Sequence, residues 1–259
     1  LFISSYSYGW DTVQTQIEGI QAGVDENTTI DYEFMDTKRF RTKEWLDMFH
    51  DMLEYHLENT EPYDVVIVGD DSALQFAMEY REEMFPEIPI VFEGVNDEEY
   101  AMKAAENPLV TGIIEKLSVE KYIDMALKVN PAADKVVAIL DDSLTGDAER
   151  KNFYSAQEAY PDLEFSEINA SEFTTARLQQ AISKVDENTI LIYIVMSEDG
   201  SGKQYTSAQA VRTIVNYAKV PVYRMVEAGI GDGLLGGNVV SMYKSGEIAA
   251  NIAMDIMNG

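Results

Sequence analysis

The sequence contains no cysteine among its 259 residues, and only 19 basic residues stand against 46 acidic ones. The absence of cysteine excludes thiol catalysis, disulfide bonds and cysteine metal sites. The formal net charge of −27 repels phosphate backbones and anionic lipid headgroups, so no nucleic acid is expected as a partner. The nearest thing to a basic patch, residues 38–43, is predicted to be a solvated loop that enters a helix.

Histidine is also scarce, and long apolar runs are missing. The only histidines, His50 and His56, lie six residues apart on one predicted helix, whereas metal-binding pairs on a helix lie four apart. No apolar run approaches the ~18 residues needed to span a bilayer, and no signal peptide is visible. Both ends of the chain look cut, because it begins inside a strand pattern without an initiator Met. The absence of targeting segments therefore says nothing about the full-length protein.

Five apolar, strand-like runs each stop abruptly at a group of small, acidic or amide residues. The runs cover residues 64–69, 88–92, 135–140, 189–195 and 220–225. A helical pattern follows four of them. Parallel α/β sheets place ligands at the carboxyl ends of their strands, so these polar groups predict a binding cleft. Turn chemistry is the competing interpretation, because the same residue types end strands and cap helices in any α/β protein.

Strand-like and helical patterns alternate along the chain at spacings that fit right-handed βαβ crossovers. Two such sets are joined near residues 110–116. The expected fold class is therefore α/β, with two doubly wound parallel-sheet lobes and a hinge. After residue 225 a glycine-rich stretch leads to a predicted strand over 234–242 and a last helix over about 246–257.

Three short sequence patterns resemble motifs of other functions, but their positions or flanking residues do not fit those motifs. Asp141-Asp142 follows a buried strand as in a phospho-receiver, but it lies in the middle of the chain, which favours cleft lining or a helix-entry turn. Gly231-Asp-Gly-Leu-Leu-Gly236 precedes a strand instead of a helix, and Gly200-Ser-Gly-Lys203 lacks the first glycine and the final Ser or Thr of a P-loop. We therefore expect no cofactor, no metal and no enzymatic activity.

Three segments resemble parts of one protein family. Residues 64–77 resemble its third strand and helix, residues 110–115 its crossing between lobes, and residues 236–250 its late return strand and helix. The family is that of ABC-transporter substrate-binding proteins with the type I periplasmic binding protein fold, which includes tryptophan-type receptors. The opening Ser4-Ser-Tyr-Ser-Tyr-Gly-Trp10 resembles a subgroup in which this domain is the extracytoplasmic sensor of a histidine kinase or diguanylate cyclase.

The resemblance implies that lobe one contains residues 1–112 plus 243–259 and that lobe two contains residues 113–242. It also implies a membrane-tethered, extracytoplasmic domain whose lobes close over a small solute. We expect a sensor domain that signals through membrane receptor domains in the same chain. The alternative is a stand-alone substrate-binding protein that serves an ABC permease.

The expected ligand contacts come from both lobes. They are Ser5, Tyr6, Trp10, Asp70, Asp71, Ser72, Glu93 and Asn96 in lobe one, and Asp142, Ser143, Ser197, Arg224 and Glu227 in lobe two. Helix N-termini would hold a carboxylate, the acidic residues would pair with an amine, and Tyr6 or Trp10 would stack on a ring or cation. An amino acid or related zwitterion fits this set best, and a cationic amine such as a polyamine is the alternative.

Overall fold

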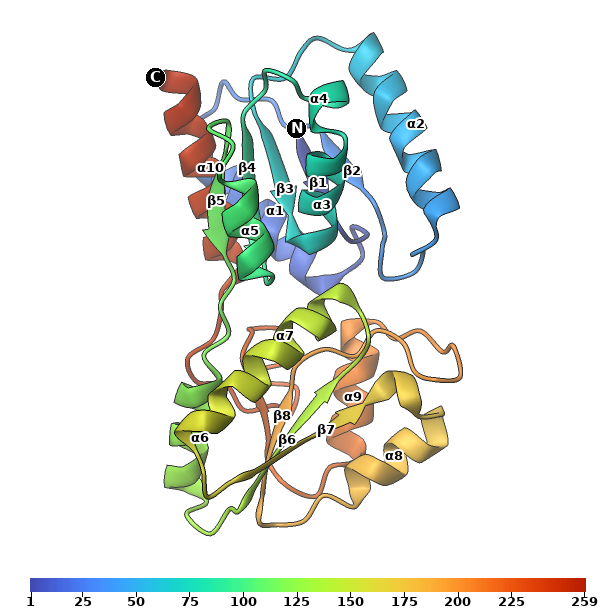
Figure 1. The fold of residues 1–259 in the computed structure, drawn as a ribbon, viewed down its shortest axis with the longest axis vertical. Coiled ribbons are helices and arrows are strands. Elements are labelled where there is room, and N and C mark those ends of the chain that lie inside the picture. The colour runs from blue at the N-terminus through green and yellow to red at the C-terminus, as the bar shows by residue number, and fades with distance from the viewer. The chain divides into compact units, whose positions relative to one another are not determined.

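The computed structural model describes residues 1–259, apart from the side chain of Asp11, and the chain divides into two α/β units. Unit 1 contains residues 1–115 and 242–259, and unit 2 contains residues 116–241. Each unit has one parallel sheet with helices on both faces (Figure 1). The boundaries that the family resemblance implies, 112/113 and 242/243, fall inside a strand and a helix that the structure keeps whole in unit 1.

The sheet of unit 1 has the strand order β2-β1-β3-β4-β5, and all its neighbouring strands are parallel. Its strands are β1 (Phe2–Ser4), β2 (Tyr32–Phe34), β3 (Val66–Gly69), β4 (Ile90–Val95) and β5 (Val110–Ile114). Its helices are α1 (Asp11–Gly23), α2 (Lys43–Asn59), α3 (Asp70–Glu79), α4 (Arg81–Met84), α5 (Glu98–Ala104) and α10 (Met242–Asn258).

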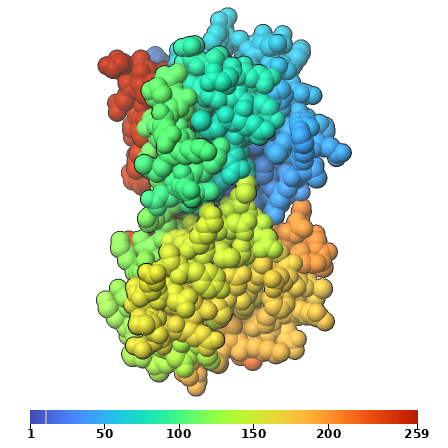
Figure 2. All heavy atoms as spheres, in the orientation of Figure 1, coloured from blue at the N-terminus to red at the C-terminus, as the bar shows by residue number. Residues whose placement is uncertain are grey.

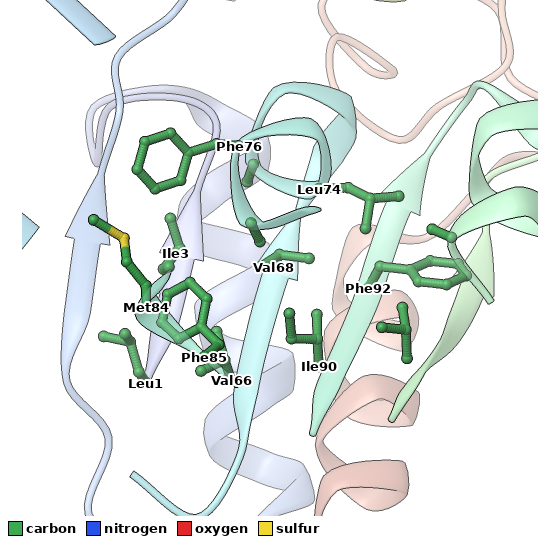
Figure 3. Packing of buried hydrophobic residues seen from close by; sticks show 14 of the residues in the cluster. Leu1, Ile3, Val66, Val68, Leu74, Phe76, Met84, Phe85, Ile90 and Phe92 are labelled. Atoms are coloured by element: carbon green, nitrogen blue, oxygen red, sulfur yellow. The ribbon is translucent and has the colours of Figure 1, made fainter. Parts of the chain in front are cut away.

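Alternate residues of the buried strands of unit 1 supply a core on each face of the sheet, as the period of two in a strand requires. Val68 and Ile90 pack with Leu74 of α3 on one face (Figure 3). Ile67 and Val91 belong to the core on the other face, which α1 and α10 cover. Strands that are buried on both faces explain why these runs are continuously apolar.

Helices α1 and α10 approach each other closely through glycine. A Cβ on Gly19 would lie 2.0 Å from the carbonyl oxygen of Tyr243, and a Cβ on Gly246 would lie 2.2 Å from the carbonyl oxygen of Gln16. No side chain fits at such distances, so the contact depends on both glycines. It attaches the last helix of the chain to the first helix of unit 1.

The sheet of unit 2 has the parallel order β7-β6-β8-β9. Its strands are β6 (Lys135–Leu140), β7 (Glu164–Asn169), β8 (Thr189–Tyr193) and β9 (Val222–Arg224). Its helices are α6 (Val119–Val129), α7 (Leu144–Ser155), α8 (Thr175–Ser183) and α9 (Ser207–Tyr217), with short 3₁₀ turns η1 (Ala156–Ala159) and η2 (Ala170–Glu172). Helix α7 and the segment after it form much of the yellow surface in Figure 2.

The expected α/β class with two parallel sheets is confirmed, but the strand predicted over 234–242 is wrong. This segment forms only isolated bridges, which pair Leu235 with Tyr223 and Val240 with Val226. Gly233 has a φ of 105°, outside the strand region, and the glycines at 236 and 237 offer no side chain to pack on a sheet. Among the described residues, no helix is long and apolar enough to cross a membrane.

Candidate functional site

The first predicted contact in unit 1, Ser5, is fully buried and bonded on both sides. Its Oγ donates to the carbonyl oxygen of Gly69 (2.7 Å) and accepts from the backbone N–H of Ala73 (2.8 Å). This hydroxyl joins the end of β1 to the first turn of α3. Turn and helix-entry chemistry therefore accounts for Ser5.

Two aromatic side chains and one lysine come together after β1; we call Tyr6, Trp10 and Lys38 the aromatic–lysine cluster. The Tyr6 and Trp10 ring centres are 6.0 Å apart. The Lys38 ammonium lies 4.5 Å from the centre of the Tyr6 ring and 5.7 Å from that of Trp10, which is within cation–π range of both. Lys38 is only 6% exposed, so the prediction that residues 38–43 form a solvated loop is wrong for this residue. Sequence reasoning missed it because lysine is seldom buried.

Asp70 and Asp71 open α3, directly after β3. Asp70 has a φ of 70°, which is uncommon for a residue with a Cβ, and its Oδ2 accepts from Gln16 Nε2 (3.2 Å). Asp71 Oδ1 accepts the backbone N–H groups of Asn96 and Asp97 (both 3.0 Å) and so fixes the loop between β4 and α5. In the part of the chain that the structure describes, the buried Oδ2 of Asp71 has no hydrogen-bond partner.

Burial is the main influence on these two carboxyl groups. It raises the pKa of Asp70 to about 7; the charge of Asp71 adds to the rise, whereas Gln16 and Lys38 oppose it. Burial also raises the pKa of Asp71, against the two backbone N–H groups that it accepts. Carboxyl groups with raised pKa values are typical of functional sites as well as of buried structural pairs.

Three other predicted ligand contacts of unit 1 differ in their burial and in their hydrogen-bond partners. Glu93 lies within β4 and is fully buried, and its Oε2 accepts from Ser245 Oγ of α10 (2.6 Å). Ser72 is half-buried, and its Oγ lies 3.4 Å from the donating Thr37 Oγ1. Asn96 is half-buried on the loop that Asp71 fixes. Glu93 therefore faces the interior, while Ser72 and Asn96 stay near the surface at the strand ends.

In unit 2 the strand ends are organised by Asp141, which is 1% exposed. Its Oδ1 accepts from the backbone N–H (3.1 Å) and Oγ (2.6 Å) of Ser143. Its Oδ2 accepts from the backbone N–H (2.7 Å) and Oγ (2.5 Å) of Ser197. Ser143 Oγ also accepts from the backbone N–H of Gly146 (3.1 Å) and caps α7. Both serine hydroxyls are thus engaged in joining the end of β6 to the segment after β8.

Asp142, the neighbour of Asp141, is exposed and takes part in a charged network on the surface. Its Oδ1 accepts from Arg150 Nη2 (2.9 Å) and from Asn169 Nδ2 (2.8 Å). Arg150 also pairs with Glu167 (3.1 Å). The network explains the presence of Asp142 without a ligand.

Arg224, at the end of β9, is a buried cation. Its guanidinium lies 4.2 Å from the centre of the Tyr193 ring. It donates to the carbonyl oxygens of Tyr193 (3.2 Å) and Ala228 (3.3 Å), and also to that of Ile194. Glu227, two residues after Met225, is exposed. Arg224 thus holds the ends of β8 and β9 together, and Glu227 is the more accessible of the two.

Asp199 is a second carboxylate centre in unit 2, which sequence reasoning did not select. Its Oδ1 accepts from Ser201 N (2.9 Å) and Oγ (2.5 Å), and its Oδ2 from Tyr205 OH (2.8 Å) and Thr175 Oγ1 (2.5 Å). Burial would raise the pKa of Asp199, but these hydrogen bonds outweigh it and lower the pKa to about 2. The Asp-x-Ser spacing of Asp199 and Ser201 is a local sequence signal for a turn. No local sequence signal predicts the contact of Asp199 with Thr175.

The histidines have structural partners. The His50 ring packs 4.4 Å from the centre of the Tyr80 ring, and His56 Nδ1 lies 2.8 Å from Glu33 Oε1. Among the described residues, no group of three or more His, Asp or Glu side chains is placed to hold a metal ion.

The profile of the ABC transporter substrate binding protein family matches residues 10–259. The chain belongs to this family. Its members bind solutes and are not enzymes, so this ABC transporter substrate-binding protein is a binding protein. No curated protein sequence matches the chain.

Several solved structures share the fold of this substrate-binding protein. An ABC domain from Streptococcus pneumoniae in complex with L-Trp has a TM-score of 0.70 at 16% identity, covering 100% of this chain and 84% of that one. A ligand-free, open substrate-binding protein with adhesive properties from Clostridium difficile has a TM-score of 0.63 at 17% identity, with the same coverage. A LacI transcriptional regulator from Lactobacillus brevis has a TM-score of 0.64 at 11% identity, covering 100% and 93%. The fold is therefore that of type I periplasmic binding proteins.

Proposed function

We propose that this protein binds an amino-acid-like solute with an aromatic group, outside the cytoplasmic membrane, and presents it to an ABC permease. The observation that carries the proposal is the aromatic–lysine cluster beside Asp71, at the carboxyl ends of the strands of unit 1. Aromatic faces with a few convergent polar groups suit a small-molecule site. The complex of the Streptococcus pneumoniae relative with L-Trp supports an aromatic amino acid as the first ligand to test.

The chemistry of the cluster fits a zwitterion. The Lys38 ammonium places a positive charge at this end of the sheet, which favours a ligand that carries a carboxylate. The Oδ2 of Asp71, which has no hydrogen-bond partner among the described residues, is an acceptor for an ammonium group. The faces of Tyr6 and Trp10 are suited to a planar ring or a cation. A polyamine is disfavoured because it has no carboxylate to offer the lysine.

The structure narrows the set of contacts that we carry forward. Some predicted residues are weaker candidates for ligand binding because their polar atoms already form hydrogen bonds within the protein. They are Ser5, Glu93, Ser143, Ser197 and Arg224. Asp142 is weaker for the same reason. Asp70 is weaker as well, because its Oδ2 accepts from Gln16. The stronger candidates are Trp10, Asp71 and Ser72 in unit 1 and Glu227 in unit 2. Tyr6 stays a candidate through its ring and Asn96 through its half-buried position.

The family assignment favours the transporter role over the sensor role. The opening segment that resembles sensor domains, residues 4–10, lies almost wholly before the start of the matched region at residue 10. An uptake assay separates the roles: cells without this protein should lose high-affinity uptake of the bound amino acid. Unchanged uptake together with a lost transcriptional response to that amino acid would instead establish the sensor role.

Binding itself is tested by thermal shift and calorimetry with L-Trp, L-Tyr, tryptamine, indole-3-propionate, spermidine and myo-inositol. We expect an aromatic amino acid to bind best, with a negative heat-capacity change from buried apolar surface. Trp10→Ala should weaken binding at least ~10-fold, the effect of about 1.4 kcal/mol, whereas Tyr55→Ala should not, because Tyr55 is 64% exposed on α2. Binding of myo-inositol alone, or of no compound in the panel, would overturn the proposal.

A further inference from the structure

A buried acid cluster lies beneath the strand ends of unit 1; it consists of Gln16, Asp70, Glu93 and Ser245. The register pairs Gly69 with Glu93 across β3 and β4, so Glu93 lies beside Asp70, the residue after Gly69. Gln16 and Glu93 are fully buried, and Asp70 is 6% exposed. The four side chains come from α1, α3, β4 and α10, so the cluster connects the sheet to both helices on one of its faces.

Two buried acceptors of the cluster have no hydrogen-bond donor among the described residues. Gln16 Nε2 donates to Asp70 Oδ2 (3.2 Å), and Ser245 Oγ donates to Glu93 Oε2 (2.6 Å). Within the described residues, Glu93 Oε1 and Gln16 Oε1 are buried acceptors that have no partner. Buried polar groups are nearly always hydrogen-bonded. A proton on the Asp70–Glu93 pair supplies one of the missing donors, because a protonated carboxyl group donates as well as accepts.

The groups around the pair act in both directions. The charge of Asp70 favours protonation of Glu93, and the charge of Asp71 on α3 favours protonation of Asp70. The Lys38 ammonium from the loop after β2 and a hydrogen bond from Tyr6 favour the ionised form of Asp70, but burial outweighs them. Helices α1 and α10 contribute the uncharged Gln16 and Ser245. Lys244 and Glu247 of α10 form an ion pair with each other.

Burial is the main cause of the raised pKa values of Asp70 and Glu93. It raises the pKa of Glu93 to about 8, with a second contribution from the Asp70 charge. Two carboxyl groups this close titrate as a coupled unit.

We propose that Asp70 and Glu93 form a proton-binding site that holds at least one proton at neutral pH and thereby fastens β4 to α1 and α10. Ser245 lies in the first turn of α10 (Met242–Asn258), at the point where the chain returns from unit 2 to unit 1. Full ionisation places two like charges in an apolar setting without enough donors. Ser245 and Gln16 favour the charged form of Glu93, but burial and the Asp70 charge outweigh them, so the folded state becomes less stable as the pH rises.

The sign of the effect on stability follows from linkage. Because the folded pKa values exceed those of the unfolded chain, the folded state binds more protons between about pH 4 and pH 8. Stability from this site is fully present below the unfolded pKa and is lost as the pH rises through the folded values. For each extra proton bound by the folded state, the unfolding equilibrium constant rises up to about tenfold per pH unit.

The test is urea unfolding of the solute-free protein at pH 5–9, compared for the wild type, Glu93→Gln and the control Glu99→Gln. Gln mimics the neutral carboxyl, so E93Q should flatten the pH dependence by up to one proton relative to wild type. E99Q should keep the wild-type dependence, because Glu99 is exposed on α5. An unchanged pH dependence in E93Q would overturn the proposal.

A second measurement decides the matter even if E93Q fails to fold. Carboxyl ¹³C NMR of wild-type protein labelled at Asp and Glu should show two coupled signals with midpoints above pH 6, one of them missing in Asp70→Asn. Titration of every carboxyl signal below pH 5.5 would exclude the site. Because no solute is present, this result is independent of the proposed ligand.

Discussion

The Lys38 ammonium lies 4.5 Å from the centre of the Tyr6 ring, although Lys38 belongs to a strongly charged stretch of sequence. The ring takes the place of part of the water that an ammonium normally binds. Lys38 also lowers the pKa of Asp70 against the larger effect of burial. One lysine thus stabilises both an aromatic pair and an acidic helix start.

Lys38→Met should therefore destabilise the solute-free protein by about 1–2 kcal/mol, the range of a desolvated cation–π contact. Methionine keeps the length of the side chain and removes the charge. Urea unfolding at pH 7 measures the effect, with Lys219→Met as the control because Lys219 is exposed. Equal stability of the two variants would show that the ammonium contributes nothing to the folded state.

The adjacent residues Asp141 and Asp142 should respond very differently to the same change. Asp141→Asn places an NH₂ group against donors from Ser143 or Ser197, and leaving buried groups unsatisfied should cost about 2–4 kcal/mol. Asp142→Asn breaks an exposed ion pair with Arg150 and should cost less than about 1 kcal/mol. Denaturant midpoints of the two variants give the comparison. A larger loss in D142N would contradict the structural role assigned to Asp141.

These contacts show what the sequence could and could not reveal. Strand β6 occupies residues 135–140 as predicted, because a continuous apolar run bounded by acidic residues is a local signal. The partner of Asp141 across the sheet, Ser197, lies 56 residues away, and no local pattern encodes that contact. The burial of Lys38 likewise depends on the Tyr6 turn, which comes from a different strand end.

For the same reason, the predicted ligand contacts include side chains that have internal structural roles as well as side chains that remain candidates for ligand binding. Sequence reasoning found polar residues at strand ends, and the structure places many of them there, whereas Glu93 lies within β4. It did not separate Ser5, whose hydroxyl joins β1 to α3, from Asp71, whose Oδ2 has no hydrogen-bond partner within the described chain. Only the hydrogen bonds seen in the structure distinguish a side chain whose polar atoms are already bonded from one that keeps an unbonded acceptor. Their roles in ligand binding remain predictions.

Because α1 and α10 are in close contact, a methyl group added between them should destabilise the protein. Gly246→Ala would place a Cβ 2.2 Å from the carbonyl oxygen of Gln16, so the helices must separate, at a cost of about 3 kcal/mol or more from overpacking. Gly9→Ala is the matched control, because a Cβ there meets no atom of the described residues within 4 Å. Thermal unfolding should show a clear loss for G246A and almost none for G9A. A G246A melting temperature equal to that of G9A would disprove the close approach.

Asp199 should stabilise the protein in an acid-sensitive way. Hydrogen bonds hold its folded pKa at about 2, below the model-peptide value, so its stabilisation is present above about pH 4 and is lost as the pH falls towards 2. The difference in unfolding free energy between wild type and Asp199→Asn should therefore shrink by about 1–2 kcal/mol between pH 5 and pH 2.5. Asp232→Asn, at an exposed position, corrects for the general relief of negative charge at low pH. A constant difference across this range would mean that the carboxylate has no preference for its charged form.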